Sequence, residues 1–181
     1  MSTGRLIAVV GPSGVGKDSV MAGLAAARPG LRVVRRAITR PAEAGGEDHE
    51  PVTLDEFARA RDAGAYALSW GAHDLFYGIP ADVDADLAAG HDVLANLSRG
   101  ALSAAAARFA GLFVLGLTAR PETLAARLAA RGREDAGQIA RRLDRQVPPP
   151  PAGVPGAVIS NDGPLETTVA VALAALYPES A

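Results

Sequence analysis

The stretch GPSGVGKDS, residues 11–19, decides the fold of this 181-residue chain. An apolar run with β-branched residues, Arg5–Val10, comes before it and predicts a buried strand, and apolar residues at helical spacing follow it over Ser19–Arg28. A glycine-rich Gly-x-x-x-x-Gly-Lys pattern between a strand and a helix is typical of a phosphate-binding loop (P-loop), whose backbone N–H groups point at phosphate oxygens. The residues expected to contact ATP are Gly11, Pro12, Ser13, Gly14, Val15, Gly16, Lys17, Asp18 and Ser19.

Lys17 is the only lysine among the 18 basic residues of the chain, and all the others are arginines. A compact ammonium on a flexible stem fits inside a tight loop where a planar guanidinium does not. We therefore expect Lys17 to reach the β- and γ-phosphates of ATP and to act as a catalytic residue.

Asp18 stands where this loop normally has a serine or threonine after its lysine. The missing hydroxyl normally binds Mg²⁺, a hard cation that also accepts carboxylate oxygen. The sequence predicts Mg²⁺ as cofactor, with ATP as co-substrate, and either Asp18 or Ser19 as its protein ligand.

The composition excludes several classes of function. A net charge of −2 and 4% aromatic residues do not favour nucleic acid, and the absence of cysteine excludes thiolate metal sites and cysteine nucleophiles. No apolar stretch approaches about 18 residues, and the N-terminus has no signal-peptide pattern. We expect one cytoplasmic domain over residues 1–181 that binds small molecules and neither nucleic acid nor membrane, as a monomer or a homodimer.

Strand-like and helix-like segments alternate along the chain, which predicts an α/β fold: a P-loop core with a parallel sheet flanked by helices. Thr53 and Glu56 form a capping-box pattern at the start of a helix, and the segment ITRPAEAGGEDHEP (38–51) reads as a polar loop. The expected strands are 31–35, 65–70, 75–77, 92–97, 112–117 and 157–160, and the expected helices are 53–64, 80–90, 102–109, 121–131 and 165–177.

The wider pattern resembles the guanylate kinases over nearly the whole chain. The motifs that carry it are the P-loop, TRP (Thr39–Pro41), YG (Tyr77–Gly78), ISNDG (159–163) and the spacing of Arg127, Arg131 and Arg142. The resemblance implies a small acceptor-binding subdomain over about 36–90 and an arginine-rich lid over about 127–145. It also implies that Arg40 binds the acceptor's phosphate with support from Tyr77. In the same way, the three arginines neutralise the transferring phosphoryl as catalytic residues, and Asn161 lies near adenine.

Residues that read guanine in that family are absent. Arg36 and Ser69 stand in the places of a serine and a glutamate, and Asn96 is the only polar residue at a strand end that is usually acidic. A site without partners for the edge of guanine cannot select it. The acceptor is therefore expected to be a phosphate compound other than GMP.

The runs ITRPAEAGGEDH (38–49) and YGIPA (77–81) resemble those of one branch, the ribose 1,5-bisphosphate phosphokinases of phosphonate metabolism. The resemblance implies transfer of the γ-phosphoryl of ATP to ribose 1,5-bisphosphate, giving 5-phosphoribosyl 1-diphosphate. The residue types fit this acceptor, since guanidinium groups suit phosphates and carboxylates accept bonds from sugar hydroxyls. The candidate acceptor-site residues are Arg36, Arg40, Glu47, Asp48, His49, Tyr77 and Asn96, with Arg35 beside them.

Two alternatives remain open at this point. One is a nucleoside monophosphate kinase with altered base choice. The other is a non-catalytic guanylate-kinase-like binding module, although such a module does not need the P-loop lysine and the lid arginines that this chain retains.

Overall fold

The central sheet of the protein has five strands, all of them parallel, in a computed structural model that describes residues 3–44, 47–132 and 147–178. Its order is β2-β7-β1-β8-β9. The strands are β1 (Leu6–Val10), β2 (Arg32–Val33), β7 (Val93–Asn96), β8 (Leu112–Thr118) and β9 (Gly156–Ser160). Because β7, β1 and β8 are parallel and in register, their carboxyl ends meet at one edge of the sheet, where the P-loop begins.

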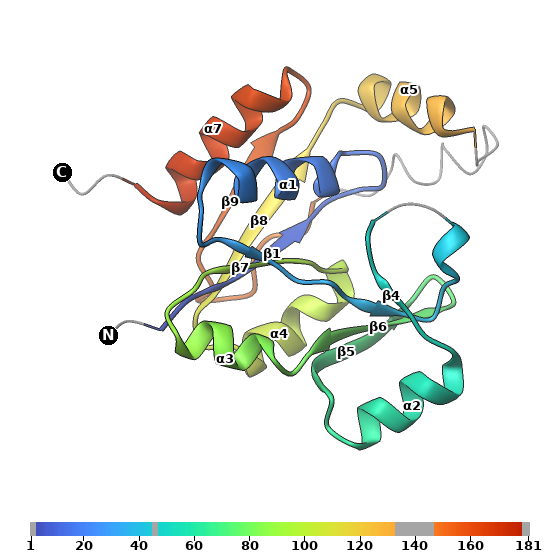
Figure 1. The fold of residues 1–181 in the computed structure, drawn as a ribbon. Coiled ribbons are helices and arrows are strands. Elements are labelled where there is room, and N and C mark those ends of the chain that lie inside the picture. The colour runs from blue at the N-terminus through green and yellow to red at the C-terminus, as the bar shows by residue number, and fades with distance from the viewer. Residues whose placement is uncertain (1–2, 45–46, 133–146, 179–181) are drawn as a thin grey trace.

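Helices cover both faces of this sheet (Figure 1). On one face lie α1 (Lys17–Ala27) and α7 (Leu165–Leu176), and on the other lie α3 (Val83–Ala88) and α4 (Leu102–Arg108). Successive side chains of β1 enter the two different cores, as the strand's two-residue period requires. The sheet is therefore buried on both sides, and its strands are apolar runs.

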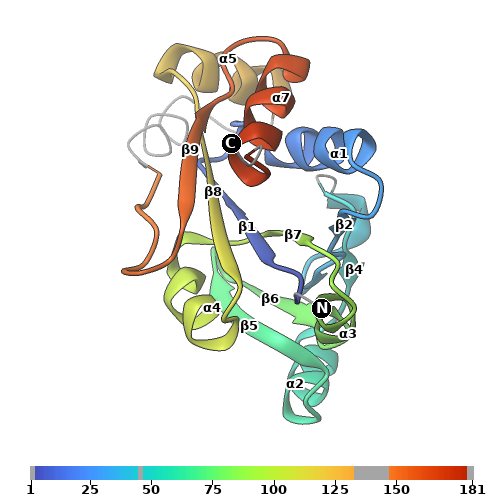
Figure 2. The same ribbon diagram turned by 90° about the vertical axis from the view of Figure 1, so that its left-hand side faces the viewer.

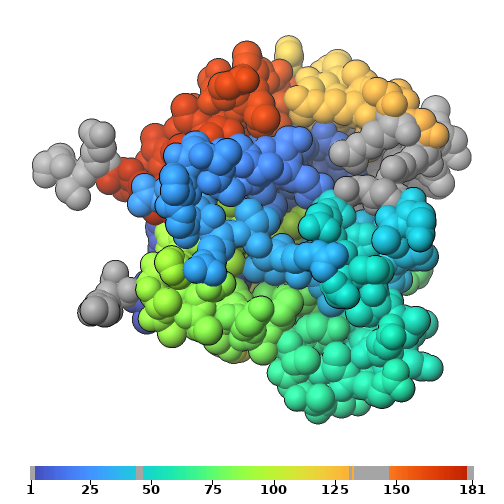
Figure 3. Space-filling view, viewed as in Figure 1, coloured from blue at the N-terminus to red at the C-terminus, as the bar shows by residue number. Residues whose placement is uncertain are grey.

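A second sheet of four strands, β4-β3-β6-β5, lies beside the core (Figure 2). Its strands are β3 (Ala37–Ile38), β4 (Glu50–Pro51), β5 (Tyr66–Ala72) and β6 (Leu75–Pro80). Leu68 and Ile79 belong to the same apolar cluster as residues of β1 and β7, so this sheet packs against the α3 and α4 side of the core. Its helix α2 (Leu54–Asp62) projects from the body of the molecule in the space-filling view (Figure 3).

Most expected elements are confirmed within a residue or two, including the capping box of Thr53 and Glu56 at α2. The expectation of a loop over 38–51 is wrong in part, because the end of β3 and all of β4 lie within it, as does the 3₁₀ turn Ala42–Ala44. The expected helix 80–90 also starts too early, since Pro80 pairs with Tyr66 as the last residue of β6 and α3 begins at Val83.

A further 3₁₀ turn, Arg99–Ala101, precedes α4, and α5 (Pro121–Arg131) begins with proline as expected. The expected lid falls largely on residues 133–146, which lie outside the described residues.

No helix within the described ranges combines the length and apolarity that a membrane crossing needs.

Asp92 anchors the C-terminal helix at the edge of the sheet opposite the P-loop. It accepts hydrogen bonds from the backbone N of Arg5 (2.7 Å), from Nη2 of Arg5 (2.8 Å) and from the hydroxyl of Tyr177 (2.8 Å). Burial alone raises the pKa of Asp92, but these hydrogen bonds outweigh it and hold the pKa below its ordinary value of 3.8. The ionised carboxylate is therefore the form that the fold stabilises.

We expect Asp92→Asn to lower the free energy of unfolding by about 1–3 kcal/mol near neutral pH, because charge-assisted bonds are lost. A carboxyl group with a lowered pKa in the folded state stabilises above its unfolded pKa and loses that contribution as the pH falls through the folded value. The difference between the native protein and the variant should therefore shrink below about pH 4. Urea unfolding at pH 7 and pH 3 measures it, and equal differences at the two values would contradict this account.

Candidate active site

The P-loop runs from Val10 at the end of β1 to Lys17 at the start of α1. Gly14 and Gly16 have φ of 83° and 94°, a left-handed conformation that side chains rarely adopt. A Cβ at Gly16 would also lie 2.7 Å from Nδ2 of Asn161. Gly14 and Gly16 are therefore needed for the turn, and Gly16 is needed also for the close approach of Asn161.

Lys17 folds back over this loop. Its Nζ donates hydrogen bonds to the carbonyl oxygens of Gly11 (2.9 Å) and Pro12 (3.3 Å), which places the ammonium at the mouth of the loop. Asp18 and Ser19 follow in the first turn of α1, and both are exposed. The loop thus combines an ammonium, a carboxylate and a hydroxyl at the N-terminus of a helix, where anions bind favourably.

Asn161 and Arg127 support the loop from behind. Nδ2 of Asn161 donates to the carbonyl of Val15 (2.7 Å), and its Oδ1 accepts from the hydroxyl of Thr168 (2.7 Å). Arg127 donates to the carbonyls of Val15 (3.2 Å) and Asn161 (2.8 Å). In this structure both side chains hold the P-loop against β9 and α5. The expected contact of the Asn161 segment with adenine stays a prediction.

The other two lid arginines cannot be placed beside Arg127. Arg131 is the last residue of α5, and Arg142 lies outside the described residues. Their predicted role at the transferring phosphoryl is not tested by the geometry.

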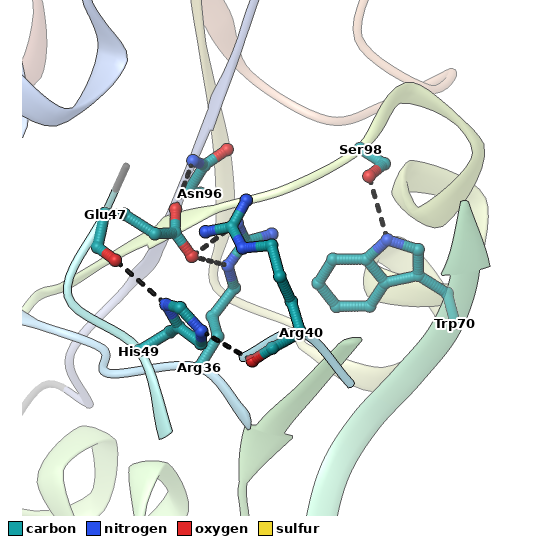
Figure 4. Close-up of polar contacts among 7 residues, drawn as sticks. All are labelled: Arg36, Arg40, Glu47, His49, Trp70, Asn96 and Ser98. Atoms are coloured by element: carbon teal, nitrogen blue, oxygen red, sulfur yellow. Dashed lines mark hydrogen bonds and ion pairs between the residues drawn. The ribbon is translucent and has the colours of Figure 1, made fainter. Parts of the chain in front are cut away.

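The candidate acceptor residues meet between the second sheet and the end of β7 (Figure 4). Nε and Nη2 of Arg36 donate to Oε1 of Glu47 (2.9 and 2.6 Å), and Nδ2 of Asn96 donates to Oε2 of Glu47 (2.8 Å). Arg36 precedes β3 and Asn96 ends β7, so one carboxylate links the second sheet to the core. Glu47 was a candidate acceptor residue from the sequence, but its pairing was not predicted, because Arg36 lies 11 residues and Asn96 lies 49 residues away along the chain.

Arg40 and His49 occupy the same loop. The ring nitrogens of His49 lie 2.9 Å from the carbonyl oxygen of Glu47 and 3.0 Å from that of Arg40, so this buried ring joins the two ends of the loop. Nε of Arg40 is a buried nitrogen without a hydrogen-bond partner in the part of the chain that the structure describes. A buried guanidinium nitrogen without a partner is costly, and a ligand oxygen would satisfy it.

Two aromatic rings form the floor beneath Arg36. The rings of Trp70 and Tyr77 stack with centroids 5.4 Å apart, and the guanidinium carbon of Arg36 lies 4.8 Å from the Tyr77 centroid. Burial raises the pKa of the Tyr77 phenol, while the charges of Arg36 and Arg40 act in the opposite direction. The phenol is thus a neutral group at physiological pH, available as a hydrogen-bond donor.

Asp48 and Arg35 face the solvent instead. Nε of Arg35 donates to Asp48 at 3.2 Å, and Arg35 also pairs with Glu50. The Asp48 side chain is 84% exposed, so the structure does not bring it together with Glu47 and Arg36.

Two structural contacts at the site were not expected from the sequence. Nε1 of Trp70 donates to the hydroxyl of Ser98 (2.9 Å), a second link between the second sheet and the core. Beside Asn161, a hydrogen bond from the backbone N of Arg120, with others from the hydroxyls of Ser160 and Thr123, lowers the pKa of Asp162 to about 2. The aspartate in ISNDG was the only sequence signal for the second contact.

Two solved structures that resemble this chain in fold are kinases. The guanylate kinase of Anaplasma phagocytophilum superposes with a TM-score of 0.69 at 18% identity, covering 94% of this chain and 83% of its own. A sugar kinase from Janibacter sp. HTCC2649 gives a TM-score of 0.58 at 19% identity, covering 96% and 94%. Fold and P-loop together define the class: a P-loop protein with the guanylate-kinase type of fold.

Sequence relatives specify the family within this class, although no family model matches the chain. The ribose 1,5-bisphosphate phosphokinase PhnN of Ruegeria sp. (strain TM1040) is 50% identical over 179 residues, 98% of this chain and 94% of that protein. The protein of the same name from Pseudomonas paraeruginosa (strain DSM 24068 / PA7) is 47% identical over 178 residues, 95% of each chain. The chain belongs to the ribose 1,5-bisphosphate phosphokinase family.

Proposed function

We propose that the protein transfers the γ-phosphoryl group of ATP to the 1-phosphate of ribose 1,5-bisphosphate, which yields 5-phosphoribosyl 1-diphosphate and ADP. The observation that carries the proposal is the 50% identity, over nearly the full length of both chains, to a ribose 1,5-bisphosphate phosphokinase. Membership of the same family supports the further proposal that the product serves phosphonate catabolism.

In this reaction the protein contributes mainly the positioning of the two substrates and the neutralisation of their charge. An oxygen of the acceptor's 1-phosphate attacks the γ-phosphorus, and the bond from that phosphorus to the β–γ bridging oxygen breaks, so that the electron pair leaves with ADP. The attacking phosphate is already anionic, and no strong general base is needed. Lys17 and the arginines 127, 131 and 142 would neutralise the charge on the transferring group.

The acceptor would bind between the second sheet and the core. A phosphate oxygen of the acceptor would satisfy the buried Nε of Arg40, and a guanidinium fork suits a phosphate. Tyr77 would support the acceptor from the floor of the site. Glu47, Asp48 and His49 come from one loop, which the bonds of His49 close over the site.

The proposal is tested by an acceptor panel with Mg-ATP, in which ADP release is measured with ribose 1,5-bisphosphate, GMP, AMP, UMP and CMP. We expect turnover with the sugar bisphosphate and a kcat/KM at least ~100-fold lower with every nucleotide, because a site built for other polar groups leaves base donors unpaired. Efficient turnover of GMP without turnover of the bisphosphate would reject it.

A nucleoside monophosphate kinase is the second candidate, favoured by the similarity in fold to a guanylate kinase. That similarity has 18% identity and supports the fold alone. The site does contain one carboxylate, Glu47, which Arg36 and Asn96 hold in a fixed orientation. The same acceptor panel distinguishes the two candidates.

Mg²⁺ is the metal we propose for this site, where it would offset the charge of the ATP phosphates. The exposed Asp18 and Ser19 fit such an ion, because Mg²⁺ keeps several waters and needs only one or two protein oxygens beside the phosphates. The described residues contain no group of three acidic or histidine side chains that would form a protein cage.

We expect Asp18→Asn to raise the Mg²⁺ concentration for half-maximal activity by about tenfold, since a charged oxygen ligand is replaced by a neutral one. Ser19→Ala is the matched variant, one residue further along α1. Titration of Mg²⁺ at saturating ATP measures both. If only Ser19→Ala raised the Mg²⁺ concentration for half-maximal activity, the metal would be assigned to the hydroxyl. If neither variant raised it, both residues would be removed from the metal site.

A further inference from the structure

The carboxylate of Glu47 is fixed between the two parts of the molecule. Arg36 holds Oε1 through Nε and Nη2 (2.9 and 2.6 Å), and Asn96 holds Oε2 at 2.8 Å. The Arg36 side chain is 7% exposed and that of Glu47 is 14% exposed, so neither can turn away into solvent. Arg36 is held in turn against the stacked rings of Tyr77 and Trp70.

This carboxylate still has room for another hydrogen bond. Two carboxylate oxygens offer about four lone-pair positions, and Arg36 and Asn96 supply three donors, the full number that residues 3–44, 47–132 and 147–178 provide. Both Arg36 donors go to Oε1, and Asn96 alone is bound to Oε2. The remaining position therefore belongs to Oε2, the oxygen on the side of β7.

The neighbouring loop residues do not offer such an acceptor. Asp48 is 84% exposed and pairs with Arg35, and both ring nitrogens of His49 face backbone carbonyl oxygens. Glu47 thus differs from the two residues that follow it in being partly buried, oriented and not saturated.

Arg40 connects this carboxylate to the bound acceptor. Its side chain is directed toward Arg36 and Glu47 in Figure 4, and its Nε is the buried nitrogen without a partner among the described residues. A phosphate that satisfied this nitrogen would bring the attached sugar to the side of Glu47. A sugar hydroxyl is a donor, and a fixed carboxylate is the acceptor that suits it.

We propose that Glu47 is the specificity-determining residue for the sugar, that its carboxylate accepts a hydrogen bond from at least one ring hydroxyl of the ribose, and that Arg36 and Asn96 are positioning residues that orient it. The proposal rests on the proposed function, because it takes a ribose phosphate as the acceptor. It assigns Arg36 to the orientation of a carboxylate, whereas the sequence had suggested direct binding of phosphate.

The test compares three acceptors: ribose 1,5-bisphosphate and its 2-deoxy and 3-deoxy analogues. A hydrogen bond to a charged group is selective by about 10- to 100-fold in kcat/KM, so the native protein should prefer ribose over at least one analogue by this factor. In Glu47→Ala, kcat/KM for ribose should fall by a similar factor, while the value for that analogue changes little. Damage to the fold would lower both values together, and a change in their ratio separates a direct contact from a structural role.

Glu50→Gln is the matched control, since it removes a carboxylate from the exposed end of the same loop, where Glu50 pairs with Arg35. It should leave the ratio at the native value. Glu47→Asp keeps the charge but withdraws it by one methylene, and we expect an intermediate ratio. If Glu47→Ala does not fold, as thermal unfolding would show, Glu47→Asp carries the test.

Unchanged ratios for both analogues in a folded, active Glu47 variant would overturn this assignment and leave the proposed function standing. A native protein that uses none of the three acceptors would reject the proposed function itself, and the assignment with it. The two failures are therefore distinguishable.

Discussion

Replacing Lys17 by alanine is expected to lower kcat by about 10³-fold or more, the scale found when a charge at the transferring group of a phosphoryl or acyl transfer is removed. The ammonium already lies at the mouth of the P-loop, where it donates to the carbonyls of Gly11 and Pro12. Binding of ATP would exchange these carbonyls for phosphate oxygens, which gain more from the charge as the transition state forms.

The control for this prediction is Lys17→Arg. It keeps the charge but places a larger, planar group in a loop whose glycines leave little space, so only a small part of the activity should return. Steady-state rates at saturating ATP, with thermal unfolding to confirm the fold, measure both variants. A kcat for Lys17→Ala within about threefold of the native value would contradict the role of the loop in catalysis.

Replacing Arg40 by alanine is the second change with a large expected effect. We expect kcat/KM for the acceptor to fall by about 100-fold, while the KM for ATP changes little, because charge-assisted bonds to one phosphate are lost. The reason lies in its Nε, which is buried and has no partner in the described part of the chain. We therefore expect a phosphate oxygen of the acceptor to accept a hydrogen bond from this nitrogen.

Arg61→Ala is the matched control for Arg40, since Arg61 is an exposed arginine of α2 beside the same sheet and pairs only locally with Asp62 at 3.0 Å. It should keep native kinetics. Initial rates with the acceptor varied at saturating ATP measure the two variants. Equal, small effects of both substitutions would show that Arg40 is an ordinary surface cation.

The core of the fold could be predicted from the sequence because its signals are local. The P-loop pattern of residues 11–19 fixes the turn between a strand and a helix, and Thr53 with Glu56 fixes the start of α2. The apolar runs of β1 and β8 can only be strands buried on both faces. Each of these features is decided by residues within one turn or one strand.

The second sheet was harder to predict, for the opposite reason. β3 and β4 have two residues each, and their pairing joins Ala37 to Glu50 across a polar loop. No local period exists in so short a strand, and pairing over that distance depends on the register of β6. The expected loop was therefore partly wrong, and the roles of the acceptor candidates within it stay predictions.

The residues of the site also divide into those that a local motif identifies and those whose roles depend on tertiary contacts. Lys17 and Arg40 were identified from motifs, and their contacts with phosphates stay predictions. The joint roles of Arg36, Glu47 and Asn96 come from tertiary contact, since the loop, β3 and β7 must fold before one carboxylate can meet both partners. Sequence listed these residues, and only the structure shows that they act through one another.

The measurement that tests the proposed reaction most directly is ³¹P NMR of the product formed from ATP and ribose 1,5-bisphosphate in the presence of Mg²⁺. The account predicts that the signal of the 1-phosphate is replaced by the two mutually coupled signals of a diphosphate, while the 5-phosphate remains a monophosphate and ADP appears in equal amount. ADP formed without a sugar diphosphate, or a new diphosphate at the 5-position, would contradict it.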